Sequence, residues 1–193
     1  MQERDNELKK IKDEVIECQR CQLHKTRNLP VIGQGSHSAK TMFIGEAPGQ
    51  SEDQTGRPFC GAAGKVLDEL LASVNIKREE VYICNILKCR PPGNRNPKPD
   101  EIKACTSYLL GQIEIIKPEI ICTLGNFSTA FILEQFGLKD KVEGIGKIHG
   151  KVFEAQSLFG KIKIIPLYHP AAATYNPNMK TILQKDFQSL LYD

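Results

Sequence analysis

Four side chains that can take part in chemistry lie near the predicted ends of strands: Glu46, Phe59, Asn85 and His169. A carboxylate can orient water or stabilise a cation, an amide can read a hydrogen-bonding edge, and an imidazole can donate to a leaving group. An aromatic ring can stack on a flat ligand. Taken singly, each has an ordinary structural explanation: a solvated carboxylate, a core ring, a turn-closing amide and a structural histidine. Their shared position at one predicted sheet edge therefore carries the functional hypothesis.

Four of the seven cysteines have spacings that suit a metal centre. Cys18 and Cys21 form a C-x-x-C motif, and Cys89 lies in a loop rich in proline and glycine. Cys105 lies on a predicted helix, with fifteen residues between it and Cys89. Zinc and a 4Fe–4S cluster both accept four thiolates, and the spacing leaves both open. The other three cysteines are expected to pack as small buried hydrophobes: Cys60, Cys84 and Cys122.

Composition and length indicate one ordinary globular domain spanning residues 1–193. The chain is 40% hydrophobic and 25% charged, and no apolar run is long enough for a bilayer span. The N-terminus does not resemble a signal peptide, so we expect an intracellular protein in a reducing compartment, where cysteines favour metals over disulfides. A net charge of +3 permits nucleic-acid binding without arguing for it. The glycine-rich segment 45–49 lacks the lysine and the spacing of common phosphate loops.

Apolar periodicity predicts helices alternating with strands, which implies a largely parallel sheet covered on both faces. In such sheets ligands bind beyond the carboxyl ends of the strands, where the four side chains lie. The predicted helices cover residues 7–18, 64–74, 98–116, 126–137 and 179–191. The predicted strands cover residues 41–49, 80–87, 119–125 and 161–170, and residues 147–155 are expected to add a short extension.

Three motifs, read together with the four cysteines, resemble those of the family 4 uracil-DNA glycosylases, the thermophile type with an iron–sulfur cluster. The motifs are GEAPGQSEDQTGRPF, NILKCRPPGNRNP and HPAAATYNP. The wider superfamily shares the first and last motifs in looser form, and the cysteine pattern narrows the choice. The resemblance covers nearly the whole chain, from Cys18 to beyond Pro177.

The resemblance implies an α/β fold: a three-layer Rossmann-like sandwich with a central, mainly parallel sheet of about four strands flanked by helices. It implies a monofunctional DNA glycosylase that flips uracil out of DNA and hydrolyses its N-glycosidic bond, leaving an abasic site for base excision repair. It also implies a 4Fe–4S cluster rather than zinc. The implied ligands are Cys18, Cys21, Cys89 and Cys105.

The resemblance further assigns roles around a flipped uracil. Phe59 would stack on the base, and the Asn85 amide would accept from N3–H and donate to O4, a pattern that cytosine reverses. Glu46 would face the sugar, His169 would donate to O2, and Glu52 would crowd the place of the thymine methyl. Three backbone units would line the base pocket: those of Gly45, Glu46 and Ala47.

The loop after His169 is expected to press into the minor groove and help fill the gap left by the flipped base. Relatives often carry bulky aliphatic residues and an arginine there, whereas this chain has Ala173, Thr174 and Tyr175. Tyr175 is the candidate wedge. The alternative is that its ring packs on the following helix.

A rival class is a non-catalytic iron–sulfur or zinc module that binds nucleic acid, or an electron carrier. Neither requires a carboxylate, an amide and an imidazole at one sheet edge. The expected partner is uracil-containing DNA, single- or double-stranded, with a sliding clamp as a further candidate and no membrane. We expect a monomer in a prokaryotic cytoplasm, associated with the nucleoid.

Overall fold

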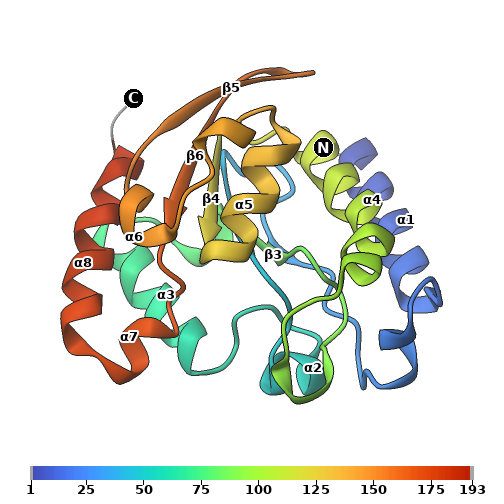
Figure 1. Cartoon of the computed structure of the whole chain (residues 1–193). Coiled ribbons are helices and arrows are strands. Elements are labelled where there is room, and N and C mark those ends of the chain that lie inside the picture. Colours follow the sequence, from blue (N-terminus) through green and yellow to red (C-terminus); the bar gives the residue numbers. More distant parts are fainter. Residues whose placement is uncertain (1, 192–193) are drawn as a thin grey trace.

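The computed structural model describes residues 2–191, whose strands form one six-stranded sheet in the order β1-β3-β2-β4-β6-β5 (Figure 1). The four central strands are parallel to one another. They are β3 (Tyr82–Asn85), β2 (Thr41–Gly45), β4 (Ile120–Leu124) and β6 (Gly160–Leu167). The antiparallel edge strands are β1 (Gln34–Gly35) and β5 (Phe153–Ser157). The predicted parallel sheet is therefore confirmed, and a short antiparallel strand extends it at each edge.

Helices cover both faces of this sheet, as the alternating sequence pattern predicts (Figure 1). Met42 and Ile44 of β2 pack into one apolar cluster, while Phe43 between them packs into the other. This alternation is the two-residue period of a strand that is buried on both sides. One cluster includes residues from α1 (Gln2–Glu17), α4 (Pro99–Ile116) and α5 (Asn126–Gln135). The other includes residues from α3 (Ala62–Ser73) and α8 (Pro177–Phe187).

The helix boundaries follow from local sequence. Helix α4 starts with Pro99, Asp100 and Glu101, because proline fits the first turn and carboxylates favour the positive end of the helix dipole. It ends at Ile116, and the next residue, Lys117, takes a left-handed conformation with φ of 56°. Helix α8 starts behind Asn176, whose side chain accepts a hydrogen bond from the Asn178 amide at 3.0 Å.

Several short elements were not predicted. Residues 147–155, expected to add a short extension, contain the start of β5, which extends the sheet beside β6. The strand predicted within 41–49 ends at Gly45, and the Gly/Pro turn expected at its end leads into a short helix that was not predicted, α2 (Gln50–Thr55). The HPAAATYNP segment contains one helical turn, α7 (Ala172–Tyr175). A further turn is α6 (Ile145–Ile148). The 3₁₀ turns are η1 (Gln22–Lys25), η2 (Arg78–Glu80), η3 (Pro92–Asn94), η4 (Lys139–Lys141) and η5 (Gln188–Leu191).

The carboxyl ends of the parallel strands point to the lower edge of Figure 1, where α2 and α7 lie. The segments after β2, β3 and β6 therefore meet at this edge, as expected for ligand-binding α/β sheets. Within residues 2–191, none of the helices combines the length and the apolar character that a membrane span requires.

Candidate active site

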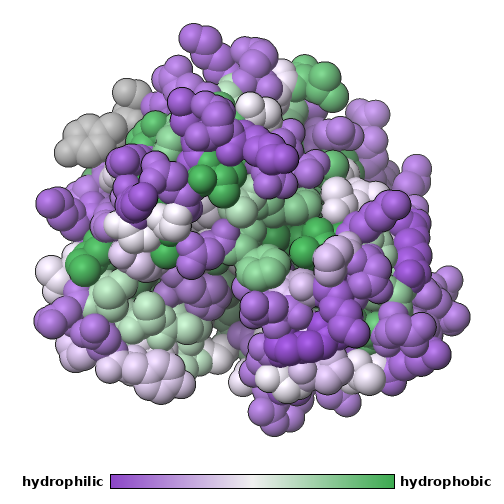
Figure 2. Space-filling model, viewed as in Figure 1, coloured by the Kyte–Doolittle hydropathy of each residue, from purple (hydrophilic) through white to green (hydrophobic). Residues whose placement is uncertain are grey.

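A pocket of about 420 Å³ lies at the carboxyl edge of the sheet. In the view of Figure 2 the surface is hollowed at its lower edge, between the α7 side and the α2 side of the molecule. Most of the predicted site residues lie on the pocket wall: Glu46, Ala47, Glu52, Phe59, Asn85, His169, Thr174 and Tyr175. Of the other two, Gly45 lies beneath Asn85 and Phe59, and Ala173 packs into the apolar cluster of α3 and α8.

Gly45 allows the side chains of Asn85 and Phe59 to pack closely against the main chain in the pocket. A methyl group at this position would lie 2.3 Å from Asn85 Oδ1 and 2.8 Å from Phe59 Cζ. Both side chains therefore rest on the Gly45 backbone, which only glycine permits. Asn85 is the last residue of β3 and is only 2% exposed, so its amide is fixed at the bottom of the pocket.

Glu46 follows β2 directly and is half-buried. The carbonyl oxygens of Gly45 and Glu46 accept hydrogen bonds from the Ile86 and Leu87 amides at 3.0 and 3.1 Å, which hold this corner beside β3. Burial raises the pKa of the Glu46 carboxyl above its ordinary value of 4.5. The ionised carboxylate is therefore held in a place where its charge is costly.

Phe59 and His169 form an aromatic wall, with ring centroids 5.6 Å apart and an angle of 29° between the rings. Phe59 has a φ of 47°, which is unusual for a bulky residue and typical of functional sites. Gly64 of α3 makes this possible, because a methyl group there would lie 1.8 Å from the Phe59 carbonyl oxygen.

Hydrogen bonding fixes the tautomer of His169. The Ala171 amide donates to His169 Nδ1 at 3.2 Å, so Nδ1 is an acceptor and the proton of the neutral ring is on Nε2. Burial lowers the pKa of His169 below its ordinary value of 6.5, while the nearby Glu52 carboxylate opposes this shift. The ring therefore offers a neutral Nε2–H donor at pH 7.

Glu52 also holds the loop that carries Phe59. Its Oε1 accepts hydrogen bonds from the Cys60 and Gly61 amides at 3.1 and 3.3 Å, just before α3 begins. A carboxylate is favoured at this end of a helix. The sequence predicted only a position facing the base for Glu52, and this supporting role was missed.

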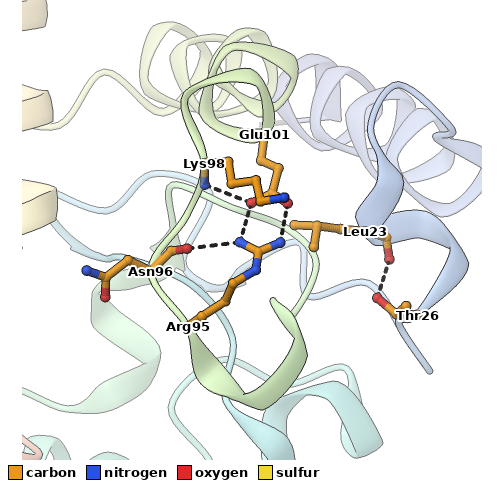
Figure 3. Close-up of polar contacts among 6 residues, drawn as sticks. All are labelled: Leu23, Thr26, Arg95, Asn96, Lys98 and Glu101. Atoms are coloured by element: carbon orange, nitrogen blue, oxygen red, sulfur yellow. Dashed lines mark hydrogen bonds and ion pairs between the residues drawn. The ribbon is translucent and has the colours of Figure 1, made fainter.

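The segment after β3 adds residues to the pocket that the sequence analysis did not single out: Pro91, Asn94 and Arg95. Figure 3 shows how this segment is held: Arg95 donates to both Glu101 carboxylate oxygens, at 2.6 and 2.9 Å, and to the Asn96 carbonyl oxygen at 2.9 Å. The Lys98 amide also donates to Glu101 at 2.8 Å. The Arg95 guanidinium lowers the pKa of Glu101. An arginine shortly before a glutamate in the first turn of a predicted helix was the sequence signal that could have indicated this ion pair.

The four predicted metal ligands, Cys18, Cys21, Cys89 and Cys105, line one small pocket between the end of α1, the segment after β3 and α4. Among residues 2–191, no three histidine, cysteine or acidic side chains converge closely enough to hold a single metal ion.

An arginine and a buried environment act on the thiols of this pocket. Arg27 donates to Cys89 Sγ at 3.1 Å and to the carbonyl oxygens of Val15 and Ile16 at 3.1 and 2.6 Å. Burial raises the pKa of Cys105 to about 11. Arg27 therefore connects the C-terminal end of α1 to Cys89.

The other cysteines divide between the core and the surface. Cys84 and Cys122 are fully buried in β3 and β4, as predicted. The prediction for Cys60 was wrong, because this residue lies in the loop between α2 and α3 and is only partly buried. Its sulfur lies 3.2 Å from Thr55 Oγ1.

Tyr175 stands at the rim of the pocket with 92% of its surface exposed. The alternative that its ring packs on the following helix is therefore wrong. The turn beneath it is held by Thr174, whose hydroxyl donates to the Ala171 carbonyl oxygen at 2.6 Å. The tyrosine is thus presented to solvent on an ordered support.

A pocket of this size, with a buried amide, an aromatic wall and a neutral imidazole donor at the edge of a parallel sheet, fits the class of α/β DNA glycosylases. The family model described as "Uracil DNA glycosylase superfamily" matches residues 32–191. The chain belongs to this superfamily.

Individual relatives narrow the assignment to the type-4 branch. A type-4 uracil-DNA glycosylase of Archaeoglobus fulgidus is 45% identical over 95% of this chain and 91% of its own length. Proteins of the same name from Saccharolobus solfataricus and Thermotoga maritima are 49% and 40% identical, covering 93% and 97% of this chain and 83% and 95% of their own lengths. The resemblance to family 4 is thereby confirmed, and the chain is a DNA glycosylase.

Proposed function

We propose that the pocket at the carboxyl edge of the sheet binds uracil flipped out of DNA and hydrolyses its N-glycosidic bond, leaving an abasic site. The observation that carries this proposal is the pairing of a buried amide, Asn85, with an Nε2–H donor on His169 across one pocket. These are the groups needed to read uracil and to support its departure. The names of the relatives agree with this reaction.

The chemistry needs groups that favour separated charges. As the bond breaks, positive charge develops on the deoxyribose and negative charge on the uracil. The Glu46 carboxylate is proposed to stabilise the sugar cation and orient the attacking water. The Nε2–H of His169 is proposed to donate to uracil O2, where the negative charge collects. The backbone of Glu46 is held beside β3 and the His169 ring is held by the Ala171 amide, so little reorganisation is needed to reach the transition state.

Asn85 is proposed to select the base. Its carbonyl oxygen would accept from uracil N3–H and its amide nitrogen would donate to O4, whereas cytosine presents an acceptor at N3 and a donor at N4. A cytosine in the pocket would leave buried polar groups unpaired, at about 1–3 kcal/mol each. Phe59 would stack on the base face, and Glu52 would crowd the place of a thymine methyl. The backbones of Gly45, Glu46 and Ala47 would line the pocket beside the base.

DNA contact is proposed to involve the α7 turn. Extruding a base costs a few kcal/mol in lost stacking and pairing. Tyr175 is the large exposed side chain of the turn formed with Ala173 and Thr174, and its ring could replace the missing base in the stack. Whether the substrate is single- or double-stranded, the base would reach the same pocket.

The four cysteines are proposed to hold a 4Fe–4S cluster. Cys18, Cys21, Cys89 and Cys105 line one pocket, although no three of these side chains converge on a single-ion site. Four thiolates can hold either zinc or a cluster, and the resemblance to family 4 supports the cluster. When bound, the cluster would tie α1 to the segment after β3 and to α4.

The direct test is incubation with a uracil-containing oligonucleotide followed by alkali, which cleaves the strand at an abasic site. We expect one cleavage product at the uracil position and none from a matched thymine oligonucleotide. Intact strands after prolonged incubation would support the non-catalytic nucleic-acid module, a class that the relatives do not favour.

We further propose that the protein acts inside the cell, on the nucleoid, as a single-domain monomer. A sliding-clamp partner stays a prediction.

A further inference from the structure

Lys88 is a lysine buried inside the protein, with 1% of its surface exposed. Its ammonium donates to the main-chain carbonyl oxygen of Asn85 at 2.8 Å and to Gln112 Oε1 at 2.7 Å. Both acceptors are neutral, and no carboxylate among residues 2–191 forms an ion pair with Lys88. Burying an ammonium group is costly, so a role beyond packing is expected for this residue.

A network of neutral groups holds the lysine in place. Gln112 of α4 is fully buried, and its amide nitrogen donates to the Ile32 carbonyl oxygen at 3.0 Å and to the Tyr82 hydroxyl at 3.1 Å. The glutamine therefore cannot rotate freely, and its oxygen stays directed at the Lys88 ammonium. The lysine in turn holds the carbonyl of Asn85.

Lys88 also borders the cysteine pocket. It lines this pocket together with Cys89 and Cys105. The Lys88 carbonyl oxygen accepts from the Val31 amide at 2.7 Å. One residue thus connects the cysteine pocket, the body of the protein and the residue that is proposed to read the base.

We propose that Lys88 is a positioning residue for base recognition, which fixes the backbone of Asn85 so that its amide meets uracil in one orientation. The inference rests on the proposed role of Asn85. The Asn85 side chain lies against Gly45 with no space to spare, so a shift of its backbone would move the amide out of register. Recognition groups need placement to within about 0.5 Å.

The test is a double-mutant cycle measured as single-turnover uracil excision from a U·G duplex. Lys88→Met keeps most of the volume and removes the donors. We expect it to lower the rate about 10- to 100-fold in the wild-type background and less than about threefold in an Asn85→Ala background, since residues acting through one another are not additive. Iron and sulfide content should equal that of the wild type, which separates the effect from loss of the cluster.

Tyr82→Phe is a graded comparison. It removes one of the two acceptors that hold the Gln112 amide and leaves both acceptors of Lys88, so its loss of rate should be smaller than that of Lys88→Met and should also depend on Asn85. If Lys88→Met does not fold, Gln112→Leu tests the same connection from the other side, because it removes one acceptor of the ammonium. Gln112→Leu should also lower the excision rate in the wild-type background and have little effect in the Asn85→Ala background.

Equal losses from Lys88→Met, or from its Gln112→Leu substitute, in both backgrounds would overturn the inference and leave Lys88 a structural residue. An unchanged rate in the wild-type background would overturn it as well. A wild-type protein that releases no uracil would instead overturn the proposed function itself, so the two failures are distinguishable.

Discussion

At the scale of single residues, the pocket disfavours the charged forms of two titratable groups, His169 and Glu46. Burial lowers the pKa of His169 and raises the pKa of Glu46, because each group loses contact with water in the pocket. A neutral imidazole donor and a poorly solvated carboxylate suit a reaction in which charge appears only as the bond breaks. We therefore expect substitutions of these two groups to change the stability of the protein as well as the rate of excision.

The first prediction concerns His169. Its folded-state pKa lies below the unfolded value of 6.5, so its contribution to stability is complete above pH 6.5 and is lost as pH falls through the folded pKa. Protonation also places a proton on Nδ1, where the Ala171 amide already donates. The difference in unfolding free energy between the wild type and His169→Asn should be constant above pH 6.5 and shrink in acid. The wild-type single-turnover rate should fall over the same range. A difference that does not vary with pH would contradict this.

The second prediction concerns Glu46. Its folded-state pKa is raised above 4.5, so the stability it contributes is present below pH 4.5 and is lost as pH rises through the folded value. Glu46→Gln should therefore melt at a higher temperature than the wild type at pH 7 and lose this advantage below pH 4.5. Its single-turnover rate should drop about 10²-fold, because the amide cannot stabilise a cation. A variant that is both slower and less stable at pH 7 would show that Glu46 mainly supports the fold.

At the scale of elements, two short segments add residues to a pocket whose main groups are positioned at the strand ends. The α7 turn contributes Thr174 and Tyr175, and the segment after β3 contributes Asn94 and Arg95. The Arg95–Glu101 pair anchors the second segment to the first turn of α4 (Figure 3). Both segments are loops on a rigid sheet, which is the usual location for binding residues.

The third prediction belongs to the α7 turn. Tyr175→Ala should leave the melting temperature nearly unchanged, because the side chain is 92% exposed. If the ring fills the vacated base position, excision should slow most on a U·A pair, less on a U·G mismatch and least on single-stranded DNA. A uniform loss on all three substrates, or no loss, would remove the tyrosine from the mechanism.

The fourth prediction belongs to the cysteine pocket. Protein purified without oxygen should be brown and contain about four iron and four sulfide ions per chain. Arg27→Met should lose iron to a chelator faster than the wild type, because Arg27 ties Cys89 to the end of α1. Arg78→Met is the control, since Arg78 bonds Asp68 and the Pro58 carbonyl oxygen and does not line the cysteine pocket. A colourless protein with one zinc ion would contradict the cluster.

At the scale of the whole molecule, the parallel sheet and its functional edge were predictable because they depend on local periodicity. Buried strands of four to eight residues that alternate with amphipathic helices are compatible with few sheet topologies. In these topologies ligands bind beyond the carboxyl ends of the strands, which predicts the functional edge. The edge strand β1 was missed because two residues carry no periodic signal. Glu46, Asn85 and His169 were predicted to meet at one sheet edge because they lie at strand ends, and all three line one pocket.

Contacts between distant segments could not be predicted in the same way. Lys88 is an ordinary charged residue in the sequence, and it is buried only because Gln112, on another element, supplies an acceptor. The bonds from Glu52 to the Cys60 and Gly61 amides depend on how α2 packs against the start of α3. The exposure of Tyr175 likewise depends on the course of the α7 turn rather than on its composition.

The most direct test of the account is to identify the base released by the wild type and by Asn85→Asp from DNA containing either uracil or an unpaired cytosine. The account predicts that the wild type releases only uracil. It predicts that Asn85→Asp releases uracil about 10²-fold or more slowly than the wild type. It also predicts that this variant releases cytosine, because an aspartate can accept a hydrogen bond from the N4 amino group of cytosine. Retention of wild-type uracil release by both Asn85→Asp and Asn85→Ala would contradict the assignment of the pocket.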